Sequence, residues 1–196
     1  DIRYPAPGDP ALAQRVSDLL STAGIETHID AKRGLDHGAW IPLSLMYADA
    51  DVPVVQLSID SQKGTRYHFR LGELLKPLRD EGVLIIGSGG ATHNLSLALR
   101  AQENAPVPDW VTRFREWLAE TVSNDSRDEL ADYRNIAPDA ALNHPTDEHL
   151  LPLLSAMGAT EPGETRRRIH ASETFGALAM DMYLFGSHTR EWIDRD

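Results

Sequence analysis

Residues 82–95 read GVLIIGSGGATHNL, an apolar run that ends in glycines and leads to a histidine and an asparagine. A short apolar run bounded by turn residues predicts a buried strand, and the glycines predict a tight turn. In open α/β sheets, ligands bind beyond the carboxyl ends of the strands. The sequence therefore predicts that the backbone passes close to a ligand at this turn and that His93 points into a cleft.

Other interpretations compete at the same turn. A dinucleotide-binding turn would need glycine where Thr92 stands, and a phosphate-binding loop would need a Gly-Lys-Ser/Thr sequence, which does not follow. No basic residue occurs between Gly87 and Leu99, so phosphate binding is disfavoured. The structural alternative is that His93 is a hydrogen-bonded histidine that closes a tight turn. The sequence alone leaves this alternative open.

Helical and strand patterns alternate along the chain. Asp9 and Pro10 are a helix cap followed by proline at the first helical position. Periodic apolar residues predict helices over residues 10–24, a short stretch ending near 47, 66–79, 109–122, 125–136, and from the cap Thr146 to about 157. Strands are predicted over 25–29, 52–59 and 82–90, with two closing strands, antiparallel to each other, in 165–170 and 176–185.

This order predicts an α/β fold with a largely parallel or mixed central sheet flanked by helices on both faces. The chain has 196 residues, enough for one domain with a sizeable core, so we expect a single domain over residues 1–196. The chain begins with Asp1 rather than a methionine, and the first residues read like the middle of a protein. We therefore expect that an N-terminal segment precedes residue 1.

The composition excludes several classes of partner. The formal net charge is -11, which argues against nucleic acid and anionic membranes because both attract a basic surface. No apolar run approaches the roughly 20 residues that a membrane-spanning helix needs. The chain has no cysteine, which excludes disulfides, thiolate metal ligands and cysteine nucleophiles. The absence of cysteine fits a reducing cytoplasm, and we expect a cytoplasmic protein.

The remaining chemical signals come from histidines. His37 lies in GLDHGAW, where the flanking glycines and Trp40 indicate a packed loop, although a histidine beside an acidic residue is often only solvated. His144 and His149 lie in HPTDEHLLPLL, residues 144–154, at the start of a predicted helix. His149 is expected in the first helical turn, where the helix dipole favours a neutral imidazole. His144 precedes a proline and is expected in an extended segment that is free to face solvent.

No dense metal-binding motif is present around these two histidines, and both could simply contact water at a surface cap. The other histidines sit in or beside ordinary elements, and we expect them to be structural or solvated. They are His28, His68, His170 and His188.

Four stretches together carry a resemblance to a known family. They are YPAPG (residues 4–8), GLDHGAWIPLSLMYADADVPVVQLSID (34–60), GSGGATHNL (87–95) and HPTDEHLLPLL (144–154). In this order they resemble the class III extradiol ring-cleavage dioxygenases, specifically the DOPA 4,5-dioxygenase type within the LigB superfamily. The resemblance covers almost the whole chain.

The resemblance implies an iron(II) enzyme, or one with zinc in the same place, that opens a catechol ring with dioxygen. By the family motifs, His93 and His149 are expected at the metal, with either one able to serve as acid and base instead. His37 is expected to contact substrate and take part in catalysis, and His144 to support substrate binding. The two other metal-binding histidines of the family belong to an N-terminal segment, one of them in a Gly-His-Gly turn. Neither motif occurs in this chain, so the 196 residues are expected not to assemble a full metal site.

The expected partners are a small aromatic diol and dioxygen, with no nucleic acid and no membrane, and a homo-oligomer is left open. Iron(II) must hold both catechol oxygens and dioxygen at once, so few protein ligands suit it. A further histidine would accept a proton from the catechol and return one later. Two other functions compete, a zinc hydrolase that uses the same histidines to activate water, and a non-catalytic binding relative that keeps the fold.

Overall fold

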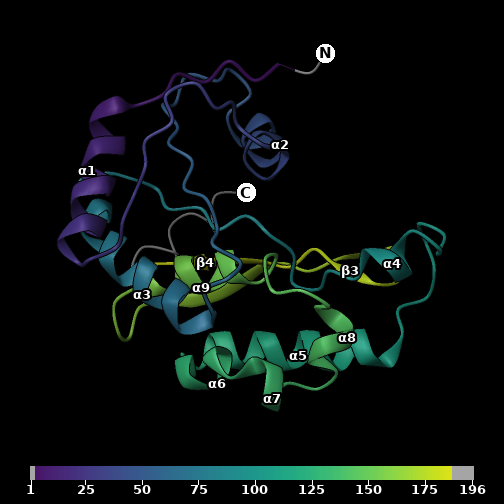
Figure 1. Cartoon of the computed structure of the whole chain (residues 1–196). Helices are drawn as coiled ribbons and strands as arrows, with labels where there is room; N and C mark the ends of the chain where they lie inside the picture. Colours follow the sequence, from purple (N-terminus) through teal and green to yellow (C-terminus); the bar gives the residue numbers. More distant parts are fainter. Residues whose placement is uncertain (1–2, 187–196) are drawn as a thin grey trace.

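The structure is a computed structural model, and it describes residues 3–186. Helices and short strands follow one another in a single domain (Figure 1). The helices are α1 (Pro10–Thr22), α2 (His37–Met46), α3 (Thr65–Leu75), the 3-10 helix η1 (Lys76–Arg79), α4 (Leu95–Ala98), α5 (Asp109–Ser123), α6 (Arg127–Ala131), α7 (Tyr133–Ile136), α8 (Ala140–Asn143) and α9 (Leu151–Gly158). The strands are β1 (Arg166–His170), β2 (Glu173–Thr174), β3 (Leu178–Ala179) and β4 (Met182–Phe185).

Helices with clear local signals lie where the sequence predicts them. α1 begins at Pro10, and the Asp9 side chain caps it by accepting a hydrogen bond from the Leu12 backbone at 2.9 Å. α5 covers the predicted 109–122 and buries one side of its surface. α3 and η1 together cover the predicted 66–79. The buried side chains of α5 are Val111, Phe114, Leu118, Thr121 and Val122.

Three predicted helix boundaries are wrong. α2 already begins at His37, because the Asp36 side chain caps it by accepting from the Ala39 backbone at 3.2 Å. The helix predicted over 125–136 is divided into α6 and α7. α9 begins at Leu151 instead of following Thr146, with a proline near its first position, where proline suits a helix start. The Thr146 hydroxyl donates to a nearby carboxylate instead of capping a helix.

The predicted parallel sheet is not confirmed. In residues 3–186 the segments 25–29, 52–59 and 82–90 contain no regular strand, and one isolated parallel bridge joins Gly8 to Val54. Central strands of a parallel sheet are buried on both faces. Here Val83 and Ile85 face the interior, whereas Leu84 is 59% and Ile86 44% exposed. The side chains of this run therefore alternate between the interior and solvent, unlike those of a central strand in a parallel sheet.

The closing strands confirm an antiparallel arrangement. β1 pairs with β4 and β2 with β3, both antiparallel, so two small two-stranded sheets follow α9. The second predicted closing strand, 176–185, is divided, because its residues belong to β3 and β4 in separate sheets.

Two apolar clusters form the core. The larger one packs α5, α6, α7 and α9 together around Phe114, Leu118, Tyr133, Leu151 and Leu154. The smaller one packs α1 against α3. Its buried members are Leu20, Leu71, Leu75 and Leu78.

The contact between α3 and α9 depends on a glycine in each helix. A β-carbon on Gly72 would stand 2.0 Å from the backbone oxygen of Ser155, and one on Gly158 would stand 2.2 Å from that of Phe69. Neither position can hold a side chain, so the two helices cross backbone against backbone. This close crossing fixes α9, and with it the segment that precedes α9.

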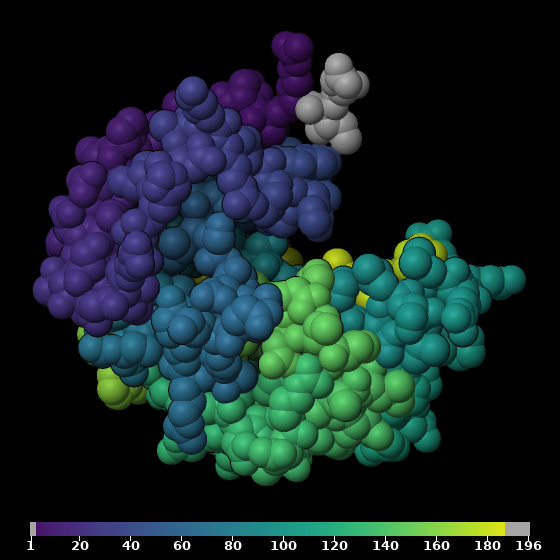
Figure 2. Space-filling view, viewed as in Figure 1, coloured from purple at the N-terminus to yellow at the C-terminus, as the bar shows by residue number. Residues whose placement is uncertain are grey.

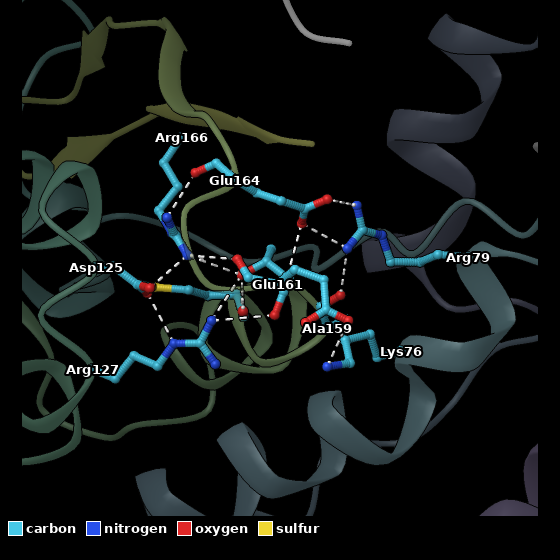
Figure 3. Close-up of polar contacts among 10 residues, drawn as sticks. Lys76, Arg79, Asp125, Arg127, Ala159, Glu161, Glu164 and Arg166 are labelled. Atoms are coloured by element: carbon cyan, nitrogen blue, oxygen red, sulfur yellow. Dashed lines mark hydrogen bonds and ion pairs between the residues drawn. The ribbon is translucent and has the colours of Figure 1, made fainter. Parts of the chain in front are cut away.

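Ion pairs fasten η1, which continues α3, to the chain that follows α9 (Figure 3). Arg79 donates two hydrogen bonds of 2.8 Å to the Glu164 carboxylate and one of 2.8 Å to the Ala159 carbonyl. Lys76 pairs with Glu161 at 2.8 Å. The same view shows a second group, Asp125 with Arg127 and Arg166.

Within the described part of the chain, no helix is both long and apolar enough to cross a membrane.

Candidate functional site

The glycine turn at residues 87–90 lies against the segment that carries His149. A β-carbon on Gly89 would stand 2.1 Å from the His149 carbonyl oxygen, and one on Gly87 would stand 2.2 Å from that of Pro152. Such distances are far inside van der Waals contact, so both positions require glycine. The close neighbour of these glycines is therefore the protein's own backbone, which brings two distant parts of the sequence together.

Hydrogen bonds join the same two segments at several points. The Gly90 backbone donates to the His149 carbonyl at 2.9 Å, and the His93 backbone donates to the Asn143 carbonyl at 2.9 Å. The Asn94 side-chain amide donates to the Leu142 carbonyl at 2.7 Å. The turn that carries His93 is thus held along its length against residues 142–149.

The result is direct contact between two predicted site residues. The imidazole rings of His93 and His149 are stacked, with 3.3 Å between ring centroids and 12° between ring planes. Both side chains are half-buried. His149 lies in a turn just before α9, so its predicted place in the first helical turn is wrong, and the helix-dipole argument does not apply to it as stated.

Burial and proximity both affect protonation at this pair. Burial lowers the pKa of His93 below its usual range, and the adjacent His149 lowers it further, with Glu148 acting weakly in the opposite direction. Nδ1 of His149 lies 3.4 Å from a carboxylate oxygen of Glu148, an ion-pair distance if the ring is protonated. Burial and the stacked contact thus both favour the neutral form of the His93 ring.

His144 does not face solvent, contrary to the expectation from its place before a proline. It is fully buried, and its Nε2 lies 2.9 Å from the Ala91 carbonyl oxygen. Its ring lies beside those of Phe114 and Tyr133, with centroids 5.4 Å and 6.2 Å away. Long-range packing, which local sequence does not encode, explains the error. Burial, above all, lowers the pKa of His144 to about 4, so the ring is neutral.

His37 lies outside the stacked pair. Its side chain is exposed at the first residue of α2, and a β-carbon on the next residue, Gly38, would stand 3.8 Å from the Ser88 hydroxyl. The first turn of α2 is thus near the glycine turn that leads to His93. The structure places His37 on a neighbouring element without joining its ring to His93 or His149 in the described residues.

Among the other histidines, His68 is buried and bonded to the Gly64 carbonyl at 3.0 Å, as expected for a structural residue. His28 is exposed, and His170 is exposed and bonded to the Ser172 hydroxyl at 2.8 Å. His188 lies outside the described residues.

Sequence reasoning missed a polar group that supports this region. Arg134 pairs with Asp147 and also donates to the His144 carbonyl, and the Tyr133 hydroxyl donates to Asp147 at 2.5 Å. Burial raises the pKa of Tyr133, which keeps its hydroxyl protonated as a donor. Nothing in the local pattern identifies Arg134, since residues 125–136 read as a polar peripheral helix.

A notch in the surface lies next to the His93 turn. Figure 2 shows the molecule hollowed between α2 (blue) and the part formed by α4 and α8 (teal and green). The turn that carries His93 leads directly into α4. Both helices beside the notch expose large apolar side chains: Ile41, Leu45 and Met46 on α2, and Leu95 and Leu97 on α4.

A metal ion requires several donor atoms that converge on one point. Within residues 3–186, no group of three or more histidine, cysteine, aspartate or glutamate side chains is arranged to hold a metal ion. The lone pairs of imidazole nitrogens lie in the ring planes, and the planes of His93 and His149 are nearly parallel. Their lone pairs therefore do not converge on one ion. In this arrangement one of the two histidines can bind a metal ion while the other lies beside it. These residues do not make a complete metal site by themselves.

Comparisons with known proteins agree with one another. The family described as catalytic LigB subunit of aromatic ring-opening dioxygenase matches residues 1–185. A protein of Beta vulgaris named 4,5-DOPA dioxygenase extradiol is 45% identical over 186 residues, which are 94% of this chain and 69% of that protein. A protein of Escherichia coli with the same name is 42% identical over 167 residues, 84% of this chain and 60% of that one.

A solved structure has the same fold. The crystal structure of an uncharacterized protein from Escherichia coli K12 superposes with a TM-score of 0.81 at 38% sequence identity. The match covers 93% of this chain and 75% of that one.

Proposed function

This chain belongs to the LigB family of catalytic subunits of aromatic ring-opening dioxygenases, and from that premise we propose that it is an extradiol dioxygenase that opens a catechol ring. The proposed substrates are dioxygen and a small aromatic diol of the DOPA type. Relatives of known name support this choice, because the proteins from Beta vulgaris and Mirabilis jalapa, at 45% and 39% identity, are both named 4,5-DOPA dioxygenase extradiol.

The single observation that carries the proposal is the stacked contact between His93 and His149. Two segments about fifty residues apart are held together by close backbone contact at Gly89 and by hydrogen bonds at Gly90 and His93. A histidine that only closes a turn needs no second imidazole against its face. The arrangement instead supports a reacting centre, in which one imidazole binds the metal and its neighbour transfers a proton.

The surface beside the pair suits an aromatic ligand. The notch between α2 and α4 has exposed apolar side chains on both of its helices, and a planar ring would bury apolar surface there (Figure 2). His37, at the start of α2, would then be near a substrate that lies in the notch. We assign to His37 the role of binding the substrate or donating a proton to it.

We propose iron(II) as the cofactor, with zinc as the alternative, since both accept neutral imidazole ligands. His149 is the proposed metal ligand, and His93 the proposed acid and base. The parallel rings support this division, because the two side chains do not point their lone pairs at one ion. The described residues do not make a complete metal site, so no catalytic step is derived through the ion.

The proposed work of His93 is proton transfer. Burial and the adjacent His149 favour the neutral form of His93, which can accept a proton from a catechol hydroxyl. His93 would hold this proton and later return it to the substrate.

The test is ring cleavage by the full-length protein loaded with iron(II) in the absence of air. Addition of DOPA and air should consume oxygen and give a yellow semialdehyde product. His93→Ala and His149→Ala should each lower the rate at least about tenfold, about 1.4 kcal/mol of barrier. His28→Ala removes an exposed histidine outside the site and is the matched control, which should keep the wild-type rate. Wild-type rates in both site variants would refute the proposal.

A further inference from the structure

We propose that His144 is a positioning residue, whose Nε2–H holds the Ala91 carbonyl and thereby fixes the turn that carries His93 against the segment that carries His149. The inference concerns the geometry of the histidine pair, and only its consequence for catalysis rests on the proposed function. It replaces the substrate-binding role expected from the sequence.

The hydrogen bond defines the state of the His144 ring. Nε2 lies 2.9 Å from the Ala91 carbonyl oxygen in a fully buried environment. A carbonyl oxygen can only accept, so Nε2 carries a proton. Nδ1 is itself buried and has no hydrogen-bond partner. The ring therefore acts as a neutral donor with one fixed orientation.

His144 is held firmly enough to serve as a support. Its ring packs beside Phe114 and Tyr133 in the larger core cluster. Its own carbonyl accepts from Arg134, which also pairs with Asp147 in the turn that leads to His149. One buried residue thus joins the core, the His149 turn and the His93 turn.

The His93 turn has a second support on its other side, which makes a specific test feasible. The Thr92 hydroxyl donates to the Ala177 carbonyl at 2.9 Å and accepts from the Ala179 backbone at 2.7 Å. The Ala91 backbone donates to the Ala179 carbonyl at 3.2 Å. Loss of the His144 donor should therefore release one side of the turn and leave the chain folded.

His144 is buried, so its side chain cannot contact a substrate directly. No part of the side chain is accessible, and both ring nitrogens are enclosed. The residue can influence a reaction through the position of His93 and His149, which are half-buried and stacked.

The experiment compares His144→Gln with His144→Leu in the full-length protein. The glutamine amide can place an N–H near the position of Nε2, whereas leucine has a similar volume and no donor. Nuclear Overhauser contacts between the rings of His93 and His149 report the stack, and calorimetric binding of Zn²⁺ reports the orientation of His149, the proposed ligand. Thermal unfolding establishes that both variants are folded.

We expect wild-type ring contacts and Zn²⁺ affinity within about threefold of wild type for His144→Gln. For His144→Leu we expect lost ring contacts and an affinity at least about tenfold lower, the usual range for a residue that orients a ligand. Retention of both properties in His144→Leu would overturn the proposal. Equal loss in both folded variants would also overturn it, since the effect would not depend on the donor.

A measurement on the unaltered protein keeps the proposal testable if His144→Leu does not fold. The ¹⁵N chemical shifts of the His144 ring nitrogens distinguish the two neutral tautomers from the charged ring. We expect the Nε2–H tautomer at pH 7. The Nδ1–H tautomer or a charged ring would overturn the proposal. The ring contacts, the Zn²⁺ affinity and the ¹⁵N shifts are all measured without turnover. A failure of the proposed dioxygenase activity would therefore not affect these results.

Discussion

The ring of His93 stacks on the ring of His149, 3.3 Å away between centroids and 12° from parallel. Residues fifty-odd positions apart in sequence come into this contact because Gly89 admits the His149 carbonyl and Gly90 donates to it. The relationship limits what each ring can do, since nearly parallel imidazoles cannot direct their lone pairs at one ion.

The two rings should differ in their effect on metal content. His149→Ala removes the proposed ligand and should lower iron occupancy of the full-length protein at least about tenfold, whereas His93→Ala should keep the iron and lose turnover. Metal analysis of both purified variants by atomic emission gives the answer. Full iron occupancy in His149→Ala, together with iron loss in His93→Ala, would show that His93 is the metal ligand and His149 the acid and base.

His37→Ala should lower turnover without loss of metal. His37 lies at the start of α2 and outside the stacked pair, so its loss should raise the barrier by about 1.4 kcal/mol or more, at least tenfold in rate. Steady-state rates and iron content should be measured on the same preparation. If His37→Ala loses its iron, the residue is a ligand or a structural support, and the assigned role is wrong.

Adjacent glycines in the turn should respond differently to alanine. A β-carbon on Gly89 would stand 2.1 Å from the His149 carbonyl oxygen, whereas one on Gly90 would stand 3.1 Å from its nearest neighbour, the Thr92 oxygen. Gly89→Ala should therefore separate the two segments, lower the midpoint of thermal unfolding and abolish the contact between the His93 and His149 rings. Gly90→Ala is the matched control and should have a much smaller effect. Equal effects of the two substitutions would show that the close approach at Gly89 is not required.

Folding stability should decrease as the pH is lowered, because of His144. Burial, with a further contribution from Arg134, lowers its pKa from 6.5 to about 4. As the pH falls from about 6.5 to about 4, the unfolded chain binds the proton first, so stability that is fully present above about pH 6.5 is progressively lost. The full difference is on the order of 3 kcal/mol.

Urea unfolding of the wild type and of His144→Gln at several pH values isolates this contribution. The advantage of the wild type over His144→Gln in free energy of unfolding should shrink as the pH falls from 7 to 4.5. A constant difference over that range would mean that the buried ring does not titrate as stated.

The sequence predicted those elements whose signals are local. Asp9 and Pro10 specify the start of α1 through a side-chain cap and a fixed proline φ, and the apolar periodicity of residues 109–122 specifies α5. The predicted start of α9 was wrong, because Thr146 bonds to a neighbouring carboxylate and a proline marks the helix start instead.

Features that depend on distant partners could not be predicted in this way. The apolar run at 82–86 has the composition of a buried strand, but a strand requires a neighbour for its backbone groups, and the described residues supply no regular ladder there. The burial of His144 depends on Ala91, Phe114 and Tyr133, which no local pattern connects to it. His93 and His149 were identified by family motifs, while their stacking required the fold.

Isotope labelling tests most directly whether the His93–His149 centre belongs to a dioxygenase. The full-length protein, loaded with iron(II), would be given DOPA under ¹⁸O₂ in ordinary water, and the ring-opened product analysed by mass spectrometry. We predict ¹⁸O in the new carboxylate of the product, and no product above background from His93→Ala. A product whose new oxygen atoms come only from water, at the same rate under nitrogen as under oxygen, would contradict the account and identify a hydrolase.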